Sequence, residues 1–256
     1  MSGHVAWISL SPVKGLALGR LEECELTEGG VAGDRRFFLV DEDDRLVNSK
    51  GLGMLQQIVP SYDEETELLT LAFPDGRSLS QEIRCNGALD ARFWSVSVPG
   101  RVVEGPWSEA FSDFTGRDLR LVRADTPATD RRRSGAATLL GTGSLRAMAR
   151  LLGVDEVDGR RFRMNFGVDG LGEHEEDEWV GRRVRIGEAV VVPQGNVGRC
   201  AVTTQTPETG VPDLDTLKAL AAYRQDVETT EPLPFGVYAA VAEPGRVRLG
   251  DPVEPL

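Results

Sequence analysis

The sequence has few of the residues that hold metal clusters or form disulfides. Its 256 residues include two histidines, His4 and His174, and three cysteines, Cys24, Cys85 and Cys200. Three cysteines cannot supply the four thiolates of an iron–sulfur cluster, and structural zinc is disfavoured because no two of them form a C-x-x-C pair. An odd number of scattered cysteines also argues against a disulfide framework and for a reducing compartment.

Long apolar runs and a leader peptide are lacking as well. The longest wholly apolar run has six residues, 237–242, whereas a helix that crosses a bilayer needs about twenty. The first residues, MSGHVAWISLSP, contain neither a basic region nor an apolar core of signal-peptide length. We therefore expect a soluble, cytoplasmic protein that does not bind membranes.

Positive charge is the third scarcity. Lysine and arginine number 29 against 41 aspartates and glutamates, which gives a formal net charge of −12. Such a chain should be repelled by nucleic acid and by anionic membrane surfaces. Only Lys14, Lys50 and Lys218 are lysines, and none lies in a recognisable Schiff-base context. This argues against pyridoxal phosphate as a cofactor.

The sequence does contain many short apolar runs separated by Gly, Pro and Asp. With 40% hydrophobic residues, a chain of this length can bury a real core, so disorder is excluded. The runs indicate a mainly β fold with a few helices, and they predict strands at 6–10, 37–40, 68–73, 96–103, 119–122, 184–186, 189–192, 237–241 and 247–249. Hairpin turns are predicted at 41–44 and 74–76, and helices near Ser108, Ser144 and Asp213 or Asp215.

A polar segment without periodicity, 124–137, is the best candidate for a domain boundary. It predicts an N-terminal β domain, residues 1–123, and a C-terminal β domain, residues 124–256. Both lengths are close to the usual domain size. The alternative is a single mixed domain with a long surface loop.

Cys200 is the cysteine with a functional context. It follows the apolar strand at 189–192, and its neighbours are Gly195, Gly198 and Arg199. Glycines let a ligand approach the backbone closely, and an adjacent arginine favours the thiolate, which is the form that attacks or binds metal. The other two cysteines lack such neighbours, so we expect them to be buried and structural.

Arginine is concentrated in one part of this acidic chain. Between Arg117 and Arg163 there are eleven arginines and six acids, a local balance of +5 that leaves −17 on the remainder. Guanidinium groups bind phosphate in a forked geometry, so two or three of these arginines would suit a compact anionic ligand such as one phosphate. We expect the rest to pair with acids elsewhere. The acidic run 173–178 is expected to be solvated, with Trp179 as its anchor.

Six motifs occur in the C-terminal part: RRFRMNFGVDG, EEDEWVG, RCAVTTQTPETG, LKALAAYR, PFGVY and GRVRLGDPV. In this order they resemble a MOSC domain, the module shared by molybdenum-cofactor sulfurases and amidoxime-reducing molybdoenzymes. SPVKGL and GDRRFFLVD resemble the β-barrel domain that precedes MOSC in proteins similar to the mitochondrial amidoxime-reducing component and its bacterial relatives. The resemblance implies an N-terminal MOSC β-barrel domain followed by a MOSC β-barrel domain.

The resemblance also implies a cofactor and a site. A molybdenum cofactor, molybdopterin with Mo, would lie between the two domains, and a protein thiolate would complete the sulfur ligation of the metal. Cys200 matches that thiolate, as both the catalytic residue and the metal ligand. The positions that match the binding of the pterin and its phosphate are Lys14, Arg36, Arg163, Asn165, Gly198 and Arg199.

By the same resemblance, the reaction is the two-electron reduction of an N-hydroxylated compound. The sequence contains no flavin or haem motif and no cysteine cluster, so the electrons would come from a separate ferredoxin, flavoprotein reductase or b-type cytochrome. The alternative is a non-catalytic molybdenum-cofactor carrier or a sulfur-relay protein in which Cys200 carries a persulfide. A third alternative, a β-barrel protein whose site has decayed, is favoured only by three departures from the family pattern, at Met164, His174 and Arg133.

Overall fold

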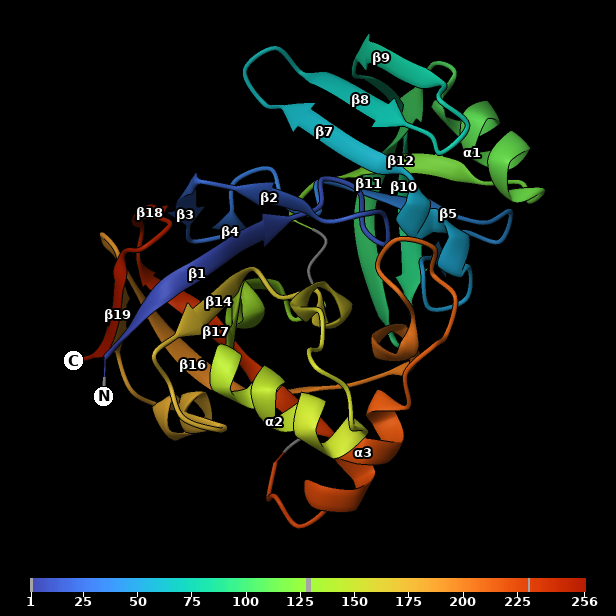
Figure 1. Cartoon of the computed structure of the whole chain (residues 1–256). Coiled ribbons are helices and arrows are strands. Elements are labelled where there is room, and N and C mark those ends of the chain that lie inside the picture. Colours follow the sequence, from blue (N-terminus) through green and yellow to red (C-terminus); the bar gives the residue numbers. More distant parts are fainter. Residues whose placement is uncertain (1, 128–129, 230) are drawn as a thin grey trace.

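Seven strands of the protein close a β-barrel. The computed structural model describes residues 2–127, 130–229 and 231–256. The strands run in the order β14-β13-β17-β16-β15-β19-β1, and the pairing of β1 with β14 closes the ring (Figure 1). Their bounds are Gly3–Leu10 for β1, Ala137–Gly141 for β13, Phe166–Asp169 for β14, Val184–Ile186 for β15, Ala189–Gly198 for β16, Pro234–Glu243 for β17 and Pro252–Pro255 for β19.

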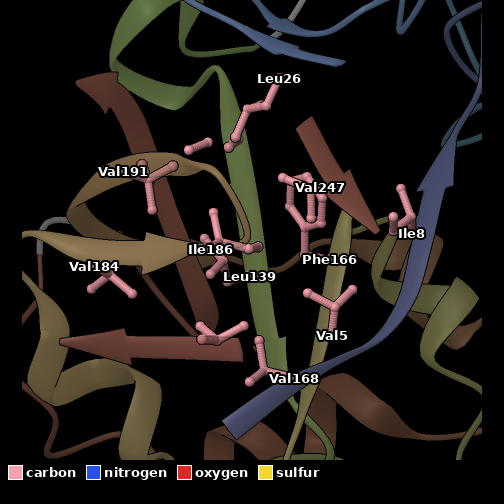
Figure 2. Close-up of a cluster of buried hydrophobic side chains, with 14 of the residues drawn as sticks. Val5, Ile8, Leu26, Leu139, Phe166, Val168, Val184, Ile186, Val191 and Val247 are labelled. Carbon is pink, nitrogen blue, oxygen red and sulfur yellow. The ribbon is translucent and has the colours of Figure 1, made fainter. Parts of the chain in front are cut away.

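The barrel forms because these strands place branched apolar side chains on one face. Val5, Ile8 and Leu139 are almost fully buried in its core, and Figure 2 shows such side chains from several strands converging on one another. A small sheet in the order β18-β3-β4 adds Cys24 and Leu26 to this cluster. Its strands are β18 (Gly245–Arg248), β3 (Glu23–Thr27) and β4 (Gly30–Val31).

The first strand therefore packs with the C-terminal part of the chain. β1 pairs with β14 and β19, and β2 (Gly19–Leu21) pairs with β1. The two termini lie side by side (Figure 1). The boundary at 123/124 stays a prediction, and the paired N-terminal strands mean that the barrel also draws on residues before it.

A second region holds the rest of the N-terminal half. It contains a five-stranded sheet in the order β10-β11-β12-β5-β6 and a three-stranded sheet in the order β7-β8-β9. Phe37, Leu39, Trp107 and Phe111 are fully buried in its core. The strands are β5 (Phe37–Val40), β6 (Leu46–Val47), β7 (Val59–Asp63), β8 (Leu68–Ala72), β9 (Ser78–Glu82), β10 (Arg84–Phe93), β11 (Val96–Glu104) and β12 (Arg120–Ala124).

Three α-helices complete the described part of the fold: α1 (Trp107–Thr115), α2 (Thr142–Leu152) and α3 (Thr216–Tyr223). Met148 of α2 and Leu220 of α3 are buried in one cluster, so these two helices pack together against the barrel. Short 3-10 helices lie at Gly53–Gln57 (η1), Arg132–Gly135 (η2), Gly159–Phe162 (η3), Glu175–Trp179 (η4) and Ala201–Thr204 (η5). Among the described residues, no helix has the length and apolar character needed to cross a membrane.

The predicted fold class is confirmed, and each predicted strand lies within or largely overlaps an observed one. Both hairpins are present, and Gly76 adopts the left-handed φ of +87° that its turn requires. The expected start of α2, with Ser144 as its N-cap and Leu145 as its first residue, is wrong by three residues, since the helix begins at Thr142. Ser144 is not its cap, because its hydroxyl donates to Glu176 Oε1 inside the protein.

Candidate functional site

A cavity of about 320 Å³ has walls from both halves of the chain. Residues of the N-terminal half line it at 14–15, 35, 48–50 and 94, and residues of the barrel half line it at 130–131, 138, 161–164, 197–200 and 202–203. Five of the seven residues expected to form the site are among them: Lys14, Arg163, Gly198, Arg199 and Cys200. The fold thus brings together residues that lie far apart in the sequence.

The N-terminal wall carries Lys14 and Arg35. The backbone of Lys14 donates to the carbonyl of Phe37 at 2.8 Å, which ties the segment after β1 to β5. Its side chain is buried, and Nζ lies 2.6 Å from Asp130 Oδ1. Arg35 pairs with the buried Asp34 and donates to the Arg163 carbonyl at 3.1 Å. Both cations are therefore held in place before any ligand arrives.

Arg163 faces them from the barrel half. It caps η3 with a left-handed backbone, φ +54°, and its guanidinium donates to the Leu16 carbonyl at 2.7 Å. Arg161, in the preceding turn, makes a forked pair with Asp213 at 2.6 and 2.7 Å. Hydrogen bonds between the two halves thus fix the loop that presents these arginines.

The end of β16 presents the glycine, arginine and cysteine. A Cβ on Gly198 would lie 2.7 Å from the Cβ of Glu231, so this position has room only for glycine. Arg199 donates to the carbonyls of Phe235 and Phe162 at 2.8 and 2.9 Å. Cys200 follows as an exposed thiol at the start of η5. The thiol is therefore accessible beside a fixed guanidinium.

The cavity is crowded with positive charge. Burial lowers the pKa of Lys14, and the nearby Arg35 and Arg163 lower it further, although Asp130 opposes them. Burial, with Arg35 beside it, lowers the pKa of Arg163 to about 10. Burial, with Arg131 beside it, lowers the pKa of Arg199 to about 9. An anion placed among these groups would be stabilised, because it would offset the repulsion between neighbouring cations and the cost of burying them.

Two of the expected residues do not line the cavity. Asn165 lies behind its wall, where its Nδ2 donates to Asp34 Oδ2 at 2.9 Å and its Oδ1 accepts from the Thr138 hydroxyl. The Arg36 guanidinium lies 3.5 Å from Glu64. Asn165 therefore supports the wall, and Arg35 occupies the place expected for Arg36.

The lining residues that were not expected include three arginines and a tryptophan: Arg35, Arg131, Arg161 and Trp94. Arg35 stands next to Arg36 in the GDRRFF motif, and no periodicity distinguishes two adjacent arginines before a strand. Arg131 and Arg161 belong to the arginine-rich segment, but nothing in the sequence assigned either of them to the site. Apart from its aromatic character, no sequence feature indicated that Trp94 lines the site.

The three departures from the family pattern differ in their distance from the cavity. Met164 lines it, and its sulfur accepts from Arg199 at 3.1 Å. His174 packs against Tyr223 and Phe235 outside the cavity wall, and its burial lowers its pKa to about 4. Arg133 is exposed and lies 3.4 Å from Glu28. Among these three, Met164 is the one that touches the site.

The expectation that the acidic run 173–178 is solvated is wrong for its centre. Glu175 and Glu176 are buried, and Glu176 Oε1 accepts from the Ser144 hydroxyl at 2.7 Å. Burial raises the pKa of Glu176 to about 7. Trp179 is buried, as expected. The run turns inward because η4 packs against β13, β16 and β17, and Glu176 accepts hydrogen bonds from Gly141 and Ser144.

The fold and site are those of a two-part β protein with a basic, thiol-bearing cavity. The model of the MOSC domain matches residues 130–254, and that of the MOSC N-terminal beta barrel domain matches residues 2–118. The chain belongs to the MOSC-domain family, in the form that carries this N-terminal barrel domain.

Curated relatives are similar along almost the whole chain. Mitochondrial amidoxime reducing component 2 of Homo sapiens is 28% identical, over 98% of this chain and 83% of the relative. The protein of the same name from Macaca fascicularis is 27% identical over the same shares. Molybdenum cofactor sulfurase of rice is 25% identical, over 87% of this chain and 31% of the relative. Among solved structures, the YUAD protein of Bacillus subtilis matches with a TM-score of 0.46 and 12% identity, over 100% of this chain and 96% of that one.

Proposed function

We propose that the protein binds molybdenum cofactor in this cavity and reduces N-hydroxylated compounds, with Cys200 as the protein thiolate on molybdenum. One observation carries the proposal. An exposed thiol shares a cavity with a set of buried cations drawn from both halves of the chain. The similarity to amidoxime reducing components supports the choice of reaction.

The residues fit the chemistry of this cofactor. A thiolate is a soft ligand of the kind that molybdenum–sulfur chemistry uses, and the cationic lining suits a pterin phosphate. Within residues 2–127, 130–229 and 231–256, no three His, Cys, Asp or Glu side chains come together as a metal site. A metal at Cys200 would therefore take its remaining ligands from a non-protein group, as a dithiolene provides.

In this proposal each residue has a separate task. Lys14, Arg35 and Arg163 bind the phosphate, and Asn165 positions the wall through Asp34 and Thr138. The backbone of Gly198 allows close approach, while Arg199 balances the charge of the Cys200 thiolate. The bound cofactor would supply two-electron redox chemistry at a Lewis-acidic metal. We place the protein in the cytoplasm, with electrons supplied by a ferredoxin, a flavoprotein reductase or a b-type cytochrome.

The test begins with protein produced in a host that makes molybdenum cofactor. The purified protein should contain molybdenum and release a fluorescent oxidised pterin, and it should reduce benzamidoxime with a chemical electron donor. Cys200→Ala should lose the reduction and most of the metal, whereas Cys85→Ala, outside the cavity, should keep both. A folded protein that holds neither molybdenum nor pterin would contradict the proposal.

A second candidate function is a cofactor carrier or a sulfur relay. It is favoured by the exposure of Cys200, because a thiol that passes a persulfide to another protein has to be reachable, and by the similarity to molybdenum cofactor sulfurase. Multiple turnovers with a chemical donor distinguish the two candidates. A carrier would hold the cofactor, or a persulfide detectable by mass spectrometry, and would not turn over.

A further inference from the structure

A second cavity adjoins the first. It has a volume of about 550 Å³ and lies between the β5–β6 hairpin, the turn between β10 and β11, and the loop after α1. Asn48, Lys50 and Trp94 form part of the wall of both cavities. We call this second cavity the side groove; its lining is Asp41, Arg45, Leu46, Val47, Asn48, Lys50, Gly51, Arg92, Trp94 and Arg117.

The side groove is positive in a protein that is strongly negative overall. Four of its lining residues are cationic and one is acidic. The acidic one, Asp41, uses Oδ1 to accept from backbone amides of its own turn at 2.9 and 3.1 Å. Arg45 pairs with Asp43 at 2.9 Å. In the part of the chain that the structure describes, no carboxylate lies within ion-pair distance of Lys50, Arg92 or Arg117.

Trp94 gives the groove an apolar wall. It is 63% exposed and lies in the β10–β11 turn with φ +50°, a conformation that a bulky residue adopts only at a cost. The preceding Phe93 is buried, and its ring packs edge-on against Phe38 with centroids 4.9 Å apart. The buried Phe93 therefore anchors the turn, which holds the large ring of Trp94 out at the junction of the two cavities.

We infer that the side groove binds the anionic end of the substrate, and that Trp94 packs against the planar middle of the same molecule. This inference rests on the proposed function, since it requires the reacting N-hydroxy group to lie in the cavity with Cys200. The three cations without carboxylate partners would bind a carboxylate or a phosphate. The preferred substrates are thus N-hydroxylated compounds with a negative charge at the far end of a flat body. A concave groove favours a small molecule over a protein surface as its occupant.

The test compares substrates that differ in charge alone. Benzamidoximes with a para linker of one to four methylenes are prepared with a terminal carboxylate, a terminal phosphate or, as the neutral match, a terminal carboxamide. At the best linker length, the anionic compound should have a KM about tenfold below that of the carboxamide. Raising the ionic strength should shrink this ratio in the wild-type protein. The phosphate and carboxylate arms identify which anion the groove prefers.

Variants then locate the effect. Arg92→Gln combined with Arg117→Gln should bring the KM ratio close to one, and Trp94→Ala should raise KM for all three series. The matched control is Arg146→Gln with Arg150→Gln, which changes two exposed arginines of α2 that line neither cavity. This control should keep the ratio of the wild type. If the first double variant does not fold, Arg117→Gln alone should reduce the ratio of the carboxamide KM to the anionic KM to half of its wild-type value or less.

The outcomes separate the groove from the proposed function. Calorimetry without an electron donor measures the affinity of the protein for the anionic and the neutral compounds, so it tests the side groove even if no reduction occurs. Charge-selective binding that depends on Arg92 and Arg117, without turnover, would contradict the proposed reductase activity and support the proposed anion binding in the side groove. Reduction of the anionic and the neutral compounds with equal KM at every linker length would contradict the proposed anion binding in the side groove and support the proposed reductase activity. If Arg92 and Arg117 alter KM only for an acidic protein donor, the groove is that partner's docking surface and the inference is wrong.

Discussion

Nζ of Lys14 lies 2.6 Å from Oδ1 of Asp130, and 116 positions of sequence separate the two residues. The lysine side chain is 7% exposed and the aspartate 46%. Both line the cavity, so the ion pair joins the N-terminal half of the chain to the first residue of the MOSC match, Asp130. The carboxylate partly balances cations that otherwise repel one another, and a phosphate would do the same more completely.

Lys14→Met should weaken cofactor binding without unfolding the protein. The cofactor loses one charge-assisted bond, while the cofactor-free protein loses one of several crowded cations and keeps a half-exposed aspartate. We expect molybdenum and pterin contents to fall severalfold and the free energy of unfolding to stay within about 1 kcal/mol of the wild type. Lys14→Arg should keep part of the cofactor. Urea unfolding and metal analysis check this; full cofactor content in a strongly destabilised Lys14→Met variant would contradict it.

Gly53 and Gly210 make a second contact between the halves, at the level of the backbone. A Cβ on Gly53 would lie 2.2 Å from the Gly210 carbonyl oxygen. Gly53→Ala should therefore force the two backbones apart and lower the free energy of unfolding by about 1–3 kcal/mol. Gly51→Ala is the matched control, because nothing lies within 4 Å of its Cβ position. It should stay within about 0.5 kcal/mol of the wild type in the same urea titration.

Much of the fold could be predicted because apolar alternation and turn residues act locally. Strands such as Phe37–Val40 and Val184–Ile186 were predicted with their observed bounds. β10 was not predicted, since the apolar residues of Arg84–Phe93 are scattered among charged and polar ones and the strand is mostly exposed. β14 has only four residues, including a glycine, so its role in closing the barrel comes from its partners β1 and β13.

The site was predicted less completely, for geometric reasons. Motif matches selected Lys14, Arg163, Gly198, Arg199 and Cys200, all of which line the cavity. Which of Arg35 and Arg36 faces the cavity depends on the left-handed backbone of Arg35, φ +51°, which sequence patterning does not reveal. The side groove depends on the β10–β11 turn meeting the β5–β6 hairpin, two segments far apart in sequence.

Glu176 should make the stability of the protein depend on pH. Burial raises its pKa from 4.5 to about 7, so the folded state binds more protons than the unfolded state between these values. Stability from this group is complete below pH 4.5 and is lost as the pH rises through 7, a loss of about 3 kcal/mol by linkage. Glu176→Gln keeps the shape of the protonated acid, so it should be more stable than the wild type at pH 8 and close to it at pH 5.

The measurement is urea unfolding of both proteins across pH 5–8. Glu178→Gln, an exposed change in the same 3-10 helix, controls for the loss of one negative charge. It should follow the wild-type profile at all pH values. Parallel profiles for the wild type and Glu176→Gln would show that Glu176 is ionised throughout this range, contrary to the prediction.

The three cysteines should differ in reactivity in the folded protein. Cys200 is exposed at the cavity, whereas burial raises the pKa of Cys24 to about 12 and also raises that of the half-buried Cys85. Because the thiolate is the reactive form, iodoacetamide at pH 8 should modify Cys200 first, Cys85 slowly and Cys24 only after unfolding in urea. Peptide mass spectrometry against time gives the order. Protein loaded with cofactor should be protected from modification at Cys200 alone, because a thiolate bound to metal cannot attack iodoacetamide. Equal labelling of Cys200 with and without cofactor would contradict its proposed role as the metal ligand.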